Sequence, residues 1–179
     1  LAALIETYFG DGSQWGLPIR YSREAEPLGT AGPIALIEGL EPPFMVMNGD
    51  VLTSLDYREF MAWHAASGAA ASVAMCRKAV EVTLGVLELG EGSEIRQYVE
   101  KPTLQYMASM GVYAFSGAVC AYLRRGQYLD FPDLIKALLA DGRSVKGYDF
   151  IGVWLDIGRR EDYEQAIEVF EGHRHEILP

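Results

Sequence analysis

The stretch from Phe44 to Phe60, FMVMNGDVLTSLDYREF, joins a strand to a helix, the connection from which α/β folds are built. Phe44–Met47 is a continuous apolar run, as expected of a strand that is covered on both faces. Asn48–Asp50 ends this run. Asn-Gly is a strong hairpin signal, but the apolar strand before it and the capped helix after it favour a strand-to-helix crossover.

The helix that follows has a clear start signal. Asp56 and Glu59 have the spacing of a capping box, and Leu55 and Phe60 have the spacing of the hydrophobic staple that surrounds such a box. Gly68 is the predicted end of this helix.

Further elements are predicted on both sides of this segment. On the N-terminal side we expect a helix over residues 1–8 that Gly10 stops, a strand over Ile19–Glu24 and a short apolar helix from Thr30 to Gly39. On the C-terminal side we expect strands over residues 71–79, 84–89, 95–99 and 110–115, a helix over Phe131–Ala140, a strand over Gly152–Asp156 and a helix over Tyr163–Phe170 that Gly172 stops.

This order of elements indicates the fold class and the domain organisation. Helices alternate with strands in the first part and strands dominate the middle, which predicts an α/β fold with a parallel sheet extended by antiparallel strands. We find no repeat, linker or low-complexity tract, so we predict one domain over residues 1–172 and a tail over residues 173–179. Ligands of such sheets bind beyond the carboxyl ends of the strands.

The charge of the chain limits its partners. It has 25 acidic and 15 basic residues and a formal net charge of -10. Such an excess repels a phosphate backbone, so nucleic acid is not an expected partner, whereas a small anionic ligand is compatible if basic groups and Mg²⁺ carry part of the charge. No apolar run approaches the ~20 residues of a membrane span, and no signal peptide is visible. We therefore expect a cytoplasmic protein without membrane association.

Cysteines and histidines offer no evident catalytic group. Cys76 and Cys120 lie far apart in apolar stretches without C-x-x-C spacing, so we expect buried free thiols in a reducing compartment rather than a zinc or redox site. His64 lies within the capped helix, where we expect a packing or surface role. His173 and His175 belong to the predicted tail.

Two aspartates are the first candidate site residues. Asp50 and Asp156 each follow an apolar strand, at the end where a ligand of the sheet would lie. Carboxylates there can hold Mg²⁺, a cation that prefers oxygen ligands and couples to substrate phosphates. The alternatives are that Asp50 belongs to a tight turn and that Asp156 caps the turn into the last helix.

A charged pair followed by proline is the second candidate. Glu100 and Lys101 are adjacent in a strand, so their side chains can share a ligand only if the chain bends there. Pro102 ends the strand and holds Lys101 extended. A carboxylate accepts hydrogen bonds from sugar hydroxyls, and a lysine provides a point charge for a phosphate. The alternative is an exposed charged pair at a strand end.

Glycines allow close approach of a ligand at one further place. Gly29 and Gly32 leave room for the backbone to approach a flat ligand. The segments Gly10–Gly12 and Gly90–Gly92 are not phosphate-binding loops, because neither lies between a strand and a following helix.

These segments, taken in order, resemble the sugar-1-phosphate nucleotidyltransferases, specifically the hexose- and heptose-1-phosphate group. The similarity extends from Leu1 to about Gly172. The matching segments are Tyr8–Gly12, Glu26–Gly32, Val46–Asp50, Val99–Pro102, Gly111–Tyr113 and Trp154–Gly158.

The resemblance implies a three-layer, Rossmann-like mixed sheet of the nucleotide-diphospho-sugar transferase type. It implies transfer of a nucleoside monophosphate from a nucleoside triphosphate to a sugar 1-phosphate, with Mg²⁺ as cofactor and with release of pyrophosphate. The implied roles are nucleobase contacts for Leu28, Gly29 and Thr30, Mg²⁺ binding for Asp50 and Asp156, sugar contacts for Gly85, Glu100 and Gly111, and phosphate binding for Lys101; Asp50, Lys101 and Asp156 would be the catalytic residues.

The form Pro-Leu-Gly-Thr-Ala-Gly-Pro over residues 27–33 looks most like mannose- or heptose-1-phosphate guanylyltransferases, which favours GTP and leaves thymidylyl, uridylyl and cytidylyl transfer open. Family members begin with a strand and a Gly-rich loop that grips the triphosphate, and this sequence does not contain that segment. We therefore expect an incomplete sheet whose gap, flanked by the strands ending at Glu24 and Asp50, is filled by a complementing N-terminal segment, by a second copy in a homo-oligomer or by rearranged strands. The alternative function is a non-catalytic nucleotide-sugar sensor or partner subunit.

Overall fold

A computed structural model describes residues 1–178, and the chain divides into two compact units. Unit 1 consists of Leu1–Glu41 and Ala118–Gly142, and unit 2 consists of Pro42–Gly117 and the residues from Arg143 onward. Each unit has its own packing. The single domain over residues 1–172 remains a prediction.

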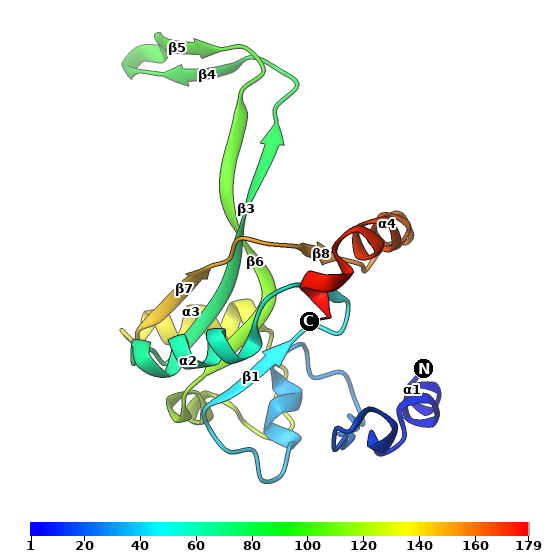
Figure 1. Ribbon diagram of the computed structural model, residues 1–179. Helices are drawn as coiled ribbons and strands as arrows, with labels where there is room; N and C mark the ends of the chain where they lie inside the picture. Colours follow the sequence, from blue (N-terminus) through cyan, green and yellow to red (C-terminus); the bar gives the residue numbers. More distant parts are fainter. Residues whose placement is uncertain (179) are drawn as a thin grey trace. The chain divides into compact units, whose positions relative to one another are not determined.

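Unit 2 is built on a four-stranded mixed sheet (Figure 1), which confirms the predicted mixed α/β class. Its strands, in spatial order, are β1 (Phe44–Met47), β6 (Thr103–Phe115), β3 (Ala71–Glu81) and β7 (Val145–Asp149). β3 and β7 pair in parallel, and the other neighbours pair antiparallel. The described sheet is thus more antiparallel than predicted, because β3 returns directly as β6, whereas a parallel pair needs a long crossover.

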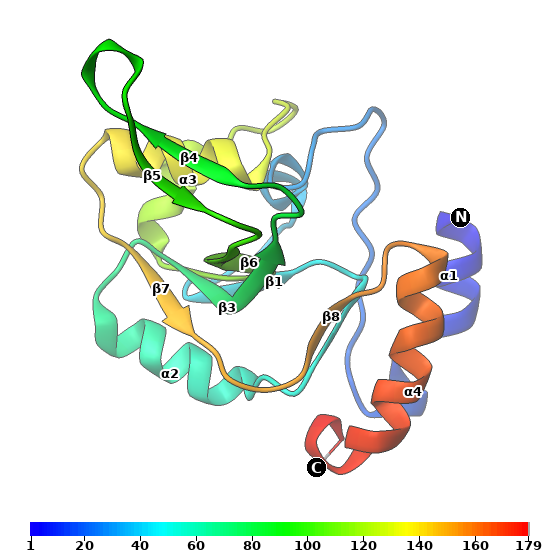
Figure 2. The ribbon, with the colours of Figure 1, turned by 90° about the horizontal axis from the view of Figure 1, so that it is seen from above.

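The helix α2 (Tyr57–Ser67) packs against β3 and β6 (Figure 2). The Asp56 carboxylate accepts hydrogen bonds from the backbone N–H groups of Arg58 and Glu59, so the predicted cap is present. Glu59 does not complete the box, because its carboxylate accepts a hydrogen bond from the Tyr148 hydroxyl at 3.0 Å instead. The core beneath the helix consists of Leu55, Phe60, Ala74, Cys76, Met110, Val112 and Ala114.

His64 belongs to the buried part of α2, which confirms its predicted packing role. Only 2% of its surface is exposed, and its Nδ1 lies 2.7 Å from the Ser72 hydroxyl. Burial lowers the pKa of this imidazole. Burial likewise raises the pKa of the Cys76 thiol, whereas Cys120 is exposed and the expectation that it is buried is wrong.

A smaller two-stranded sheet pairs β2 (Val51–Thr53) with β8 (Trp154–Asp156), and α4 (Arg160–Ile177) packs beside it. The chain therefore passes from β1 through β2 into α2, and Asn48–Asp50 is not a hairpin turn. α4 has non-helical dihedral angles at His173, directly after Gly172, so the first helical segment ends where the sequence predicted. A second helical segment continues from this kink to Ile177, so most of the predicted tail is helical.

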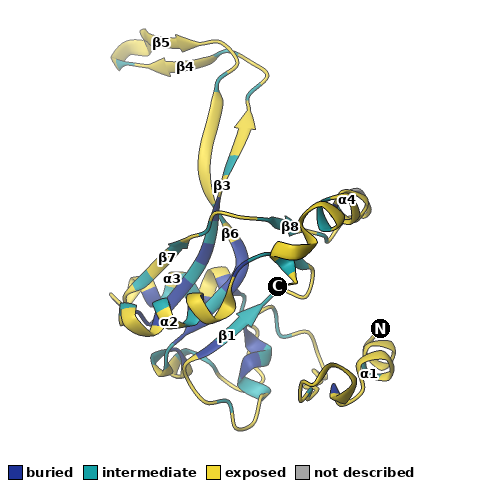
Figure 3. Ribbon diagram, in the orientation of Figure 1, coloured by how far each residue is buried: buried dark blue, intermediate teal, exposed yellow. Residues whose placement is uncertain are grey.

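Beyond the core, the chain forms an arm, defined here as residues 79–105. It consists of the outer halves of β3 and β6 and of the hairpin β4 (Val86–Leu89) and β5 (Ile95–Val99), with the 3-10 turn η3 (Glu91–Ser93). The arm extends away from the four-stranded sheet and is largely exposed (Figure 3). Its exposed large apolar residues are Val80, Leu84, Val86, Leu87, Leu89, Ile95, Tyr98, Val99 and Leu104.

Unit 1 contains helices and irregular chain. Its elements are α1 (Ala2–Phe9), the 3-10 turns η1 (Ser13–Trp15) and η2 (Gly32–Leu36), η4 (Gly117–Tyr122) at its boundary, and α3 (Phe131–Ala140) with the predicted bounds. The predicted strand over residues 19–24 is wrong. This segment is held by isolated contacts, such as the Ile19 amide to the Asp11 carbonyl and the Tyr21 hydroxyl to the Gly10 carbonyl, rather than by a neighbouring strand. Two strands were predicted to flank the place of the N-terminal family segment. The one ending at Glu24 is not a strand, and the other, β1, is an edge strand of its sheet.

Within residues 1–178, no helix combines the length and apolar character that crossing a membrane requires.

His64 provides a test of the buried α2 contact. Its pKa is lower in the folded protein than the usual value near 6.5, so the unfolded state binds more protons once the pH falls below that value. The contribution of His64 to the free energy of unfolding is therefore fully present above about pH 6.5. It decreases as the pH falls toward the folded-state pKa, by at most about 1.4 kcal/mol per pH unit. Urea unfolding at about pH 7.5 and about pH 5.5 should show this loss. His64→Asn, which cannot titrate and can still bond to Ser72, should show a smaller one. An equal pH dependence in both proteins would contradict the assignment.

Candidate functional site

Asp50 and Asp156 converge on one point of unit 2. β2 and β8 pair with Val51 opposite Asp156, and the Ile157 amide donates to the Asp50 carbonyl at 2.8 Å. A Cβ atom on Gly158 would lie 3.1 Å from Asp50 Oδ2 and 3.2 Å from Asp156 Oδ1. The two carboxylates predicted from separate strand ends therefore lie within reach of a shared ion.

A β-bulge in β6 holds both aspartate-bearing segments. Residues 110–112 of β6 lie opposite the single residue Ala74 of β3, and Gly111 has a φ of 72° that favours glycine. The Gly111 carbonyl accepts the Asn48 amide at 2.9 Å, two residues before Asp50. The Met110 carbonyl accepts the Trp154 indole N–H at 2.9 Å, two residues before Asp156. The bulge thus fixes the chain ahead of each carboxylate.

The carboxylates line a cavity that also contains basic groups. Its lining residues are Asp50, Lys78, Trp154, Leu155, Asp156, Gly158, Arg159, Asp162 and Gln165. Lys78 and Arg159 are site residues that sequence reasoning missed. Neither has a spacing signal, because Lys78 is a charged residue in a strand and Arg159 precedes a helix in a charged run.

The donor set fits Mg²⁺ that is bound together with phosphate. Asp156 Oδ1 accepts the Gly158 amide at 3.1 Å, so this aspartate does stabilise the turn after β8, as the alternative interpretation stated. Among the described residues, the Asp50 carboxylate accepts no hydrogen bond and no group of three or more His, Cys, Asp or Glu side chains is suited to hold a metal. Two carboxylates do not form a closed protein cage, but Mg²⁺ is commonly held by one or two carboxylates plus substrate phosphates.

Glu100 and Lys101 lie in the arm, at a bend of the chain. Lys101 has a φ of 45°, so the bend that would let the two side chains share a ligand is present. Glu100 Oε2 accepts a hydrogen bond from the Tyr98 hydroxyl at 2.8 Å, which raises the pKa of that phenol. A Cβ on Gly85 would lie 3.1 Å from the same oxygen. Gly85 and Glu100 therefore form one cluster, whereas Gly111 lies in the bulge beside Asn48, in a separate place.

In unit 1, the segment Leu28–Gly32 packs closely against residues 127–131. Gly29 has a φ of 77°, and a Cβ there would lie 2.6 Å from the Leu129 carbonyl oxygen. A Cβ on Gly32 would lie 2.6 Å from the Gln127 carbonyl oxygen. These glycines accommodate the protein's own backbone, which is sufficient to explain them without a flat ligand.

Asp130 connects the two parts of this segment and was not singled out from the sequence. Its Oδ1 accepts the Thr30 amide at 2.9 Å and the Thr30 hydroxyl at 3.2 Å, and the Thr30 Oγ1 accepts the Phe131 amide at 2.9 Å. The Tyr128 hydroxyl and the Thr30 amide hold the pKa of the Asp130 carboxyl below its usual value. Thr30 is thus oriented by its neighbours.

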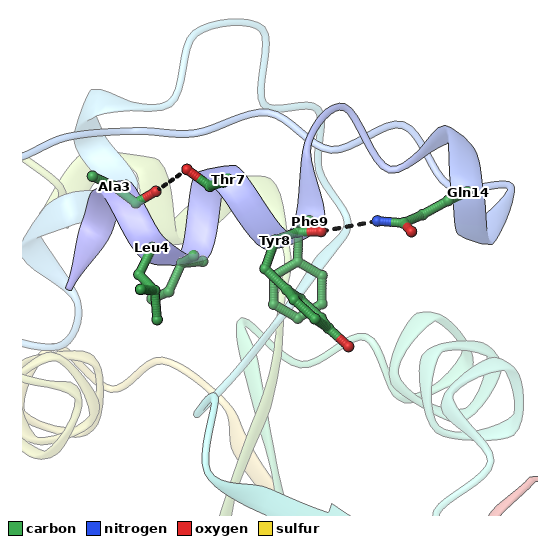
Figure 4. A pocket seen from close by; sticks show the side chains of 7 residues that line it. Ala3, Leu4, Thr7, Tyr8, Phe9 and Gln14 are labelled. Atoms are coloured by element: carbon green, nitrogen blue, oxygen red, sulfur yellow. Dashed lines mark hydrogen bonds between the residues drawn. The ribbon is translucent and has the colours of Figure 1, made fainter.

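The apolar surface over α1 contains few polar groups that could take part in a reaction (Figure 4). The Thr7 hydroxyl donates to the Ala3 carbonyl at 2.7 Å, and the Gln14 amide donates to the Tyr8 carbonyl at 2.9 Å. The remaining lining side chains include Leu4, Tyr8 and Phe9, which pack or stack but do not catalyse.

The sequence profile of the nucleotidyl transferase family matches residues 1–171. The chain belongs to this family. The match includes both converging aspartates and the Leu28–Gly32 segment.

Relatives within this family act on sugar phosphates, according to their names. The chain is 34% identical over 169 residues to a mannose-1-phosphate guanylyltransferase of Mycobacterium tuberculosis, which covers 90% of this chain and 46% of the relative. It is 32% identical over 187 residues to a UTP–glucose-1-phosphate uridylyltransferase of Synechocystis, covering 93% of this chain and 48% of the relative. The chain therefore spans about half the length of these curated relatives.

Solved structures share the nucleotidyl transferase fold. A Bacillus anthracis protein assigned as a glucose-1-phosphate thymidylyltransferase has a TM-score of 0.68 at 21% identity, covering 93% of this chain and 71% of that one. HddC of Yersinia pseudotuberculosis complexed with GMP-PN has a TM-score of 0.59 at 24% identity, covering 92% and 74%. Similarity at this level establishes the fold.

Gly29 provides a test of the close packing in unit 1. Gly29→Ala places a methyl group against the Leu129 carbonyl and also strains a positive φ. The matched control is Gly126→Ala, because Gly126 has the same φ of 77° and open space around it. We expect the control to lower the free energy of unfolding by about 1 kcal/mol and Gly29→Ala to lower it by at least about 1 kcal/mol more. Equal losses in chemical denaturation would show that the close approach is unimportant.

Proposed function

We propose that this protein transfers a nucleoside monophosphate from a nucleoside triphosphate to a sugar 1-phosphate and releases pyrophosphate. The observation that carries this proposal is the convergence of Asp50 and Asp156 at Gly158 in a member of the nucleotidyl transferase family. A phosphate oxygen of the sugar phosphate attacks the α-phosphorus, and the bond from that phosphorus to the oxygen of the β-phosphate breaks. Little covalent chemistry is asked of the protein, so catalysis depends on positioning and on charge neutralisation.

Asp50 and Asp156 would hold Mg²⁺, which supplies positive charge to the reacting phosphates. Asp50 is suited to this role because its carboxylate is not engaged by a hydrogen bond from the described residues. Asp156 keeps one oxygen available while the other accepts the Gly158 amide. The bulge carbonyls of Met110 and Gly111 keep both segments in register.

Sugar and nucleobase contacts would come from other segments. Gly85 and Glu100 would bind the sugar hydroxyls, and the Tyr98 hydroxyl supports this by holding one Glu100 oxygen so that the other is presented for bonding. Lys101, at the bend, would bind the sugar phosphate. Gly111, which lies in the bulge apart from Gly85 and Glu100, would line the sugar pocket from beside Asn48.

Leu28, Gly29 and Thr30 would contact the nucleobase. GTP and a mannose- or heptose-type sugar are favoured by the Pro-Leu-Gly-Thr-Ala-Gly-Pro segment and by the mannose-1-phosphate guanylyltransferases among the relatives.

Metal binding can be tested without the reaction. Terbium(III) is a hard ion that takes oxygen ligands and is sensitised by nearby tryptophan, and Trp154 lines the same cavity as the two aspartates. We expect terbium emission excited through tryptophan, reduced by added Mg²⁺. Asp50→Asn and Asp156→Asn should each weaken terbium binding about tenfold or more, because each removes a charged oxygen ligand. The control Asp133→Asn, on α3, should bind normally. Unchanged binding in both site variants would exclude this metal site.

Transfer itself is measured as pyrophosphate release from GTP and mannose 1-phosphate. Because residues 1–179 contain no Gly-rich triphosphate loop, the assay uses a polypeptide in which such a family segment precedes Leu1. We expect release that requires both substrates and Mg²⁺ and that falls by about 100-fold or more in Asp156→Asn, as for loss of a transition-state charge contact. Retained sugar-phosphate binding with no release would instead support the non-catalytic sensor.

A further inference from the structure

The Lys78 side chain, on β3, contacts an aromatic ring. This side chain is half-buried, and its Nζ lies 4.5 Å from the centroid of the Trp154 ring, within the range of a cation–π contact. The Trp154 ring is itself held, because its indole N–H donates to the Met110 carbonyl in the bulge. The ammonium group is therefore kept at the wall of the cavity that Asp50 and Asp156 line.

The neighbouring cation has a different environment. Arg77, on the opposite face of β3, lies with its Nη2 3.0 Å from Asp149 Oδ2 and is thereby paired. Lys78 has no carboxylate oxygen within ion-pair distance among the described residues, although Asp50 and Asp156 line the same cavity. If Lys78 served to neutralise these aspartates, a direct ion pair would be expected. A cation–π contact orients an ammonium group but leaves its charge and its N–H donors available.

The cavity lined by Asp50 and Asp156 also contains two cations, Lys78 and Arg159, that form no ion pair with the described residues. Such a combination of carboxylates and cations suits a phosphate group. Phosphate oxygens can bind the metal on one side and accept hydrogen bonds from an ammonium group on the other, and charge-assisted bonds of this kind are about twice as strong as neutral ones. We infer that Lys78 binds a phosphate group in the Asp50–Asp156 cavity, with Trp154 holding its side chain in position. This inference rests on the proposed function, because it assumes that a phosphorylated substrate or product enters the cavity.

Two sources of phosphate are chemically equivalent for Lys78: the sugar 1-phosphate and the triphosphate with its pyrophosphate product. The experiment therefore titrates the 179-residue chain with mannose 1-phosphate and, separately, with pyrophosphate, each with Mg²⁺, by calorimetry. Mannose without phosphate is the control ligand. Trp154 emission is recorded in the same titrations, because a phosphate group bound to the ammonium group changes the charge beside the indole ring. Trp15 and Trp63 give a constant background.

Lys78→Met keeps the length and packing of the side chain and removes its charge. We expect it to weaken binding of at least one phosphate ligand about tenfold or more, as expected for loss of a charge-assisted hydrogen bond, and to abolish the change in Trp154 emission. Lys78→Arg should restore most of the affinity. Arg77→Met removes the same charge from the same strand on its other face, so it should leave phosphate affinity unchanged.

The outcomes separate this inference from the proposed function. Lys78-dependent binding of pyrophosphate without binding of mannose 1-phosphate would support the role of Lys78 and count against the proposed sugar acceptor. Equal affinity of wild type and Lys78→Met for both phosphate ligands overturns the inference, as does equal weakening by Arg77→Met. Absence of phosphate binding by the wild-type chain also overturns it. A loss of thermal stability in Lys78→Met with unchanged affinity assigns the residue to packing alone.

Discussion

Pairing between β3 and β6 is the interaction on which the rest of unit 2 depends. The ladder runs from Ala71 opposite Phe115 to Glu81 opposite Thr103, so one pair of strands carries the core at one end and the arm at the other. Between these ends, the bulge at Gly111 interrupts the pairing of β6 with β3. The Gly111 carbonyl accepts the Asn48 amide and so continues the register in which β1 pairs with β6, whereas the Met110 carbonyl accepts the Trp154 indole N–H. Residues 110–111 of β6 thus link the sheet to both aspartate-bearing segments.

The sequence predicted correctly those elements that are determined by residues close together in the chain. The cap at Asp56, the apolar run of β1 and the bounds of α3 agree with the structure, because each depends on residues close in sequence. Elements that depend on distant partners were missed or misplaced. β2 is a strand only because β8 lies beside it, and residues 19–24 alternate like a strand but have none to pair with among the described residues. The helical residues beyond Gly172 were missed because a second helical segment follows the kink at His173 directly.

The two aspartates of the candidate site could be predicted from the sequence, whereas its basic residues could not. Asp50 and Asp156 could be found because each follows an apolar strand, and strand exits are where ligands of such sheets bind. Lys78 could not, since its alignment with Trp154 depends on where β8 crosses the molecule. Gly29 shows a further limit of the sequence. It could not reveal that the nearest atom to a Cβ at this position is the chain's own carbonyl oxygen at Leu129, and the predicted ligand contact stays a prediction. Sequence identifies which groups are present but not which of them the fold brings together.

The division into units has a consequence for the covalent architecture of the protein. Unit 1 is assembled from two stretches of chain, and unit 2 from two others, in strict alternation along the sequence. Neither unit can be excised as one continuous polypeptide, and a single cut after Gly117 leaves each with only one of its stretches. β7, which completes the sheet beside β3, is reached only after the chain has returned to unit 1 and formed α3. The segment proposed to contact the nucleobase therefore lies in one unit and the two aspartates proposed to hold the metal lie in separate stretches of the other, so only the whole interleaved chain contains all of them.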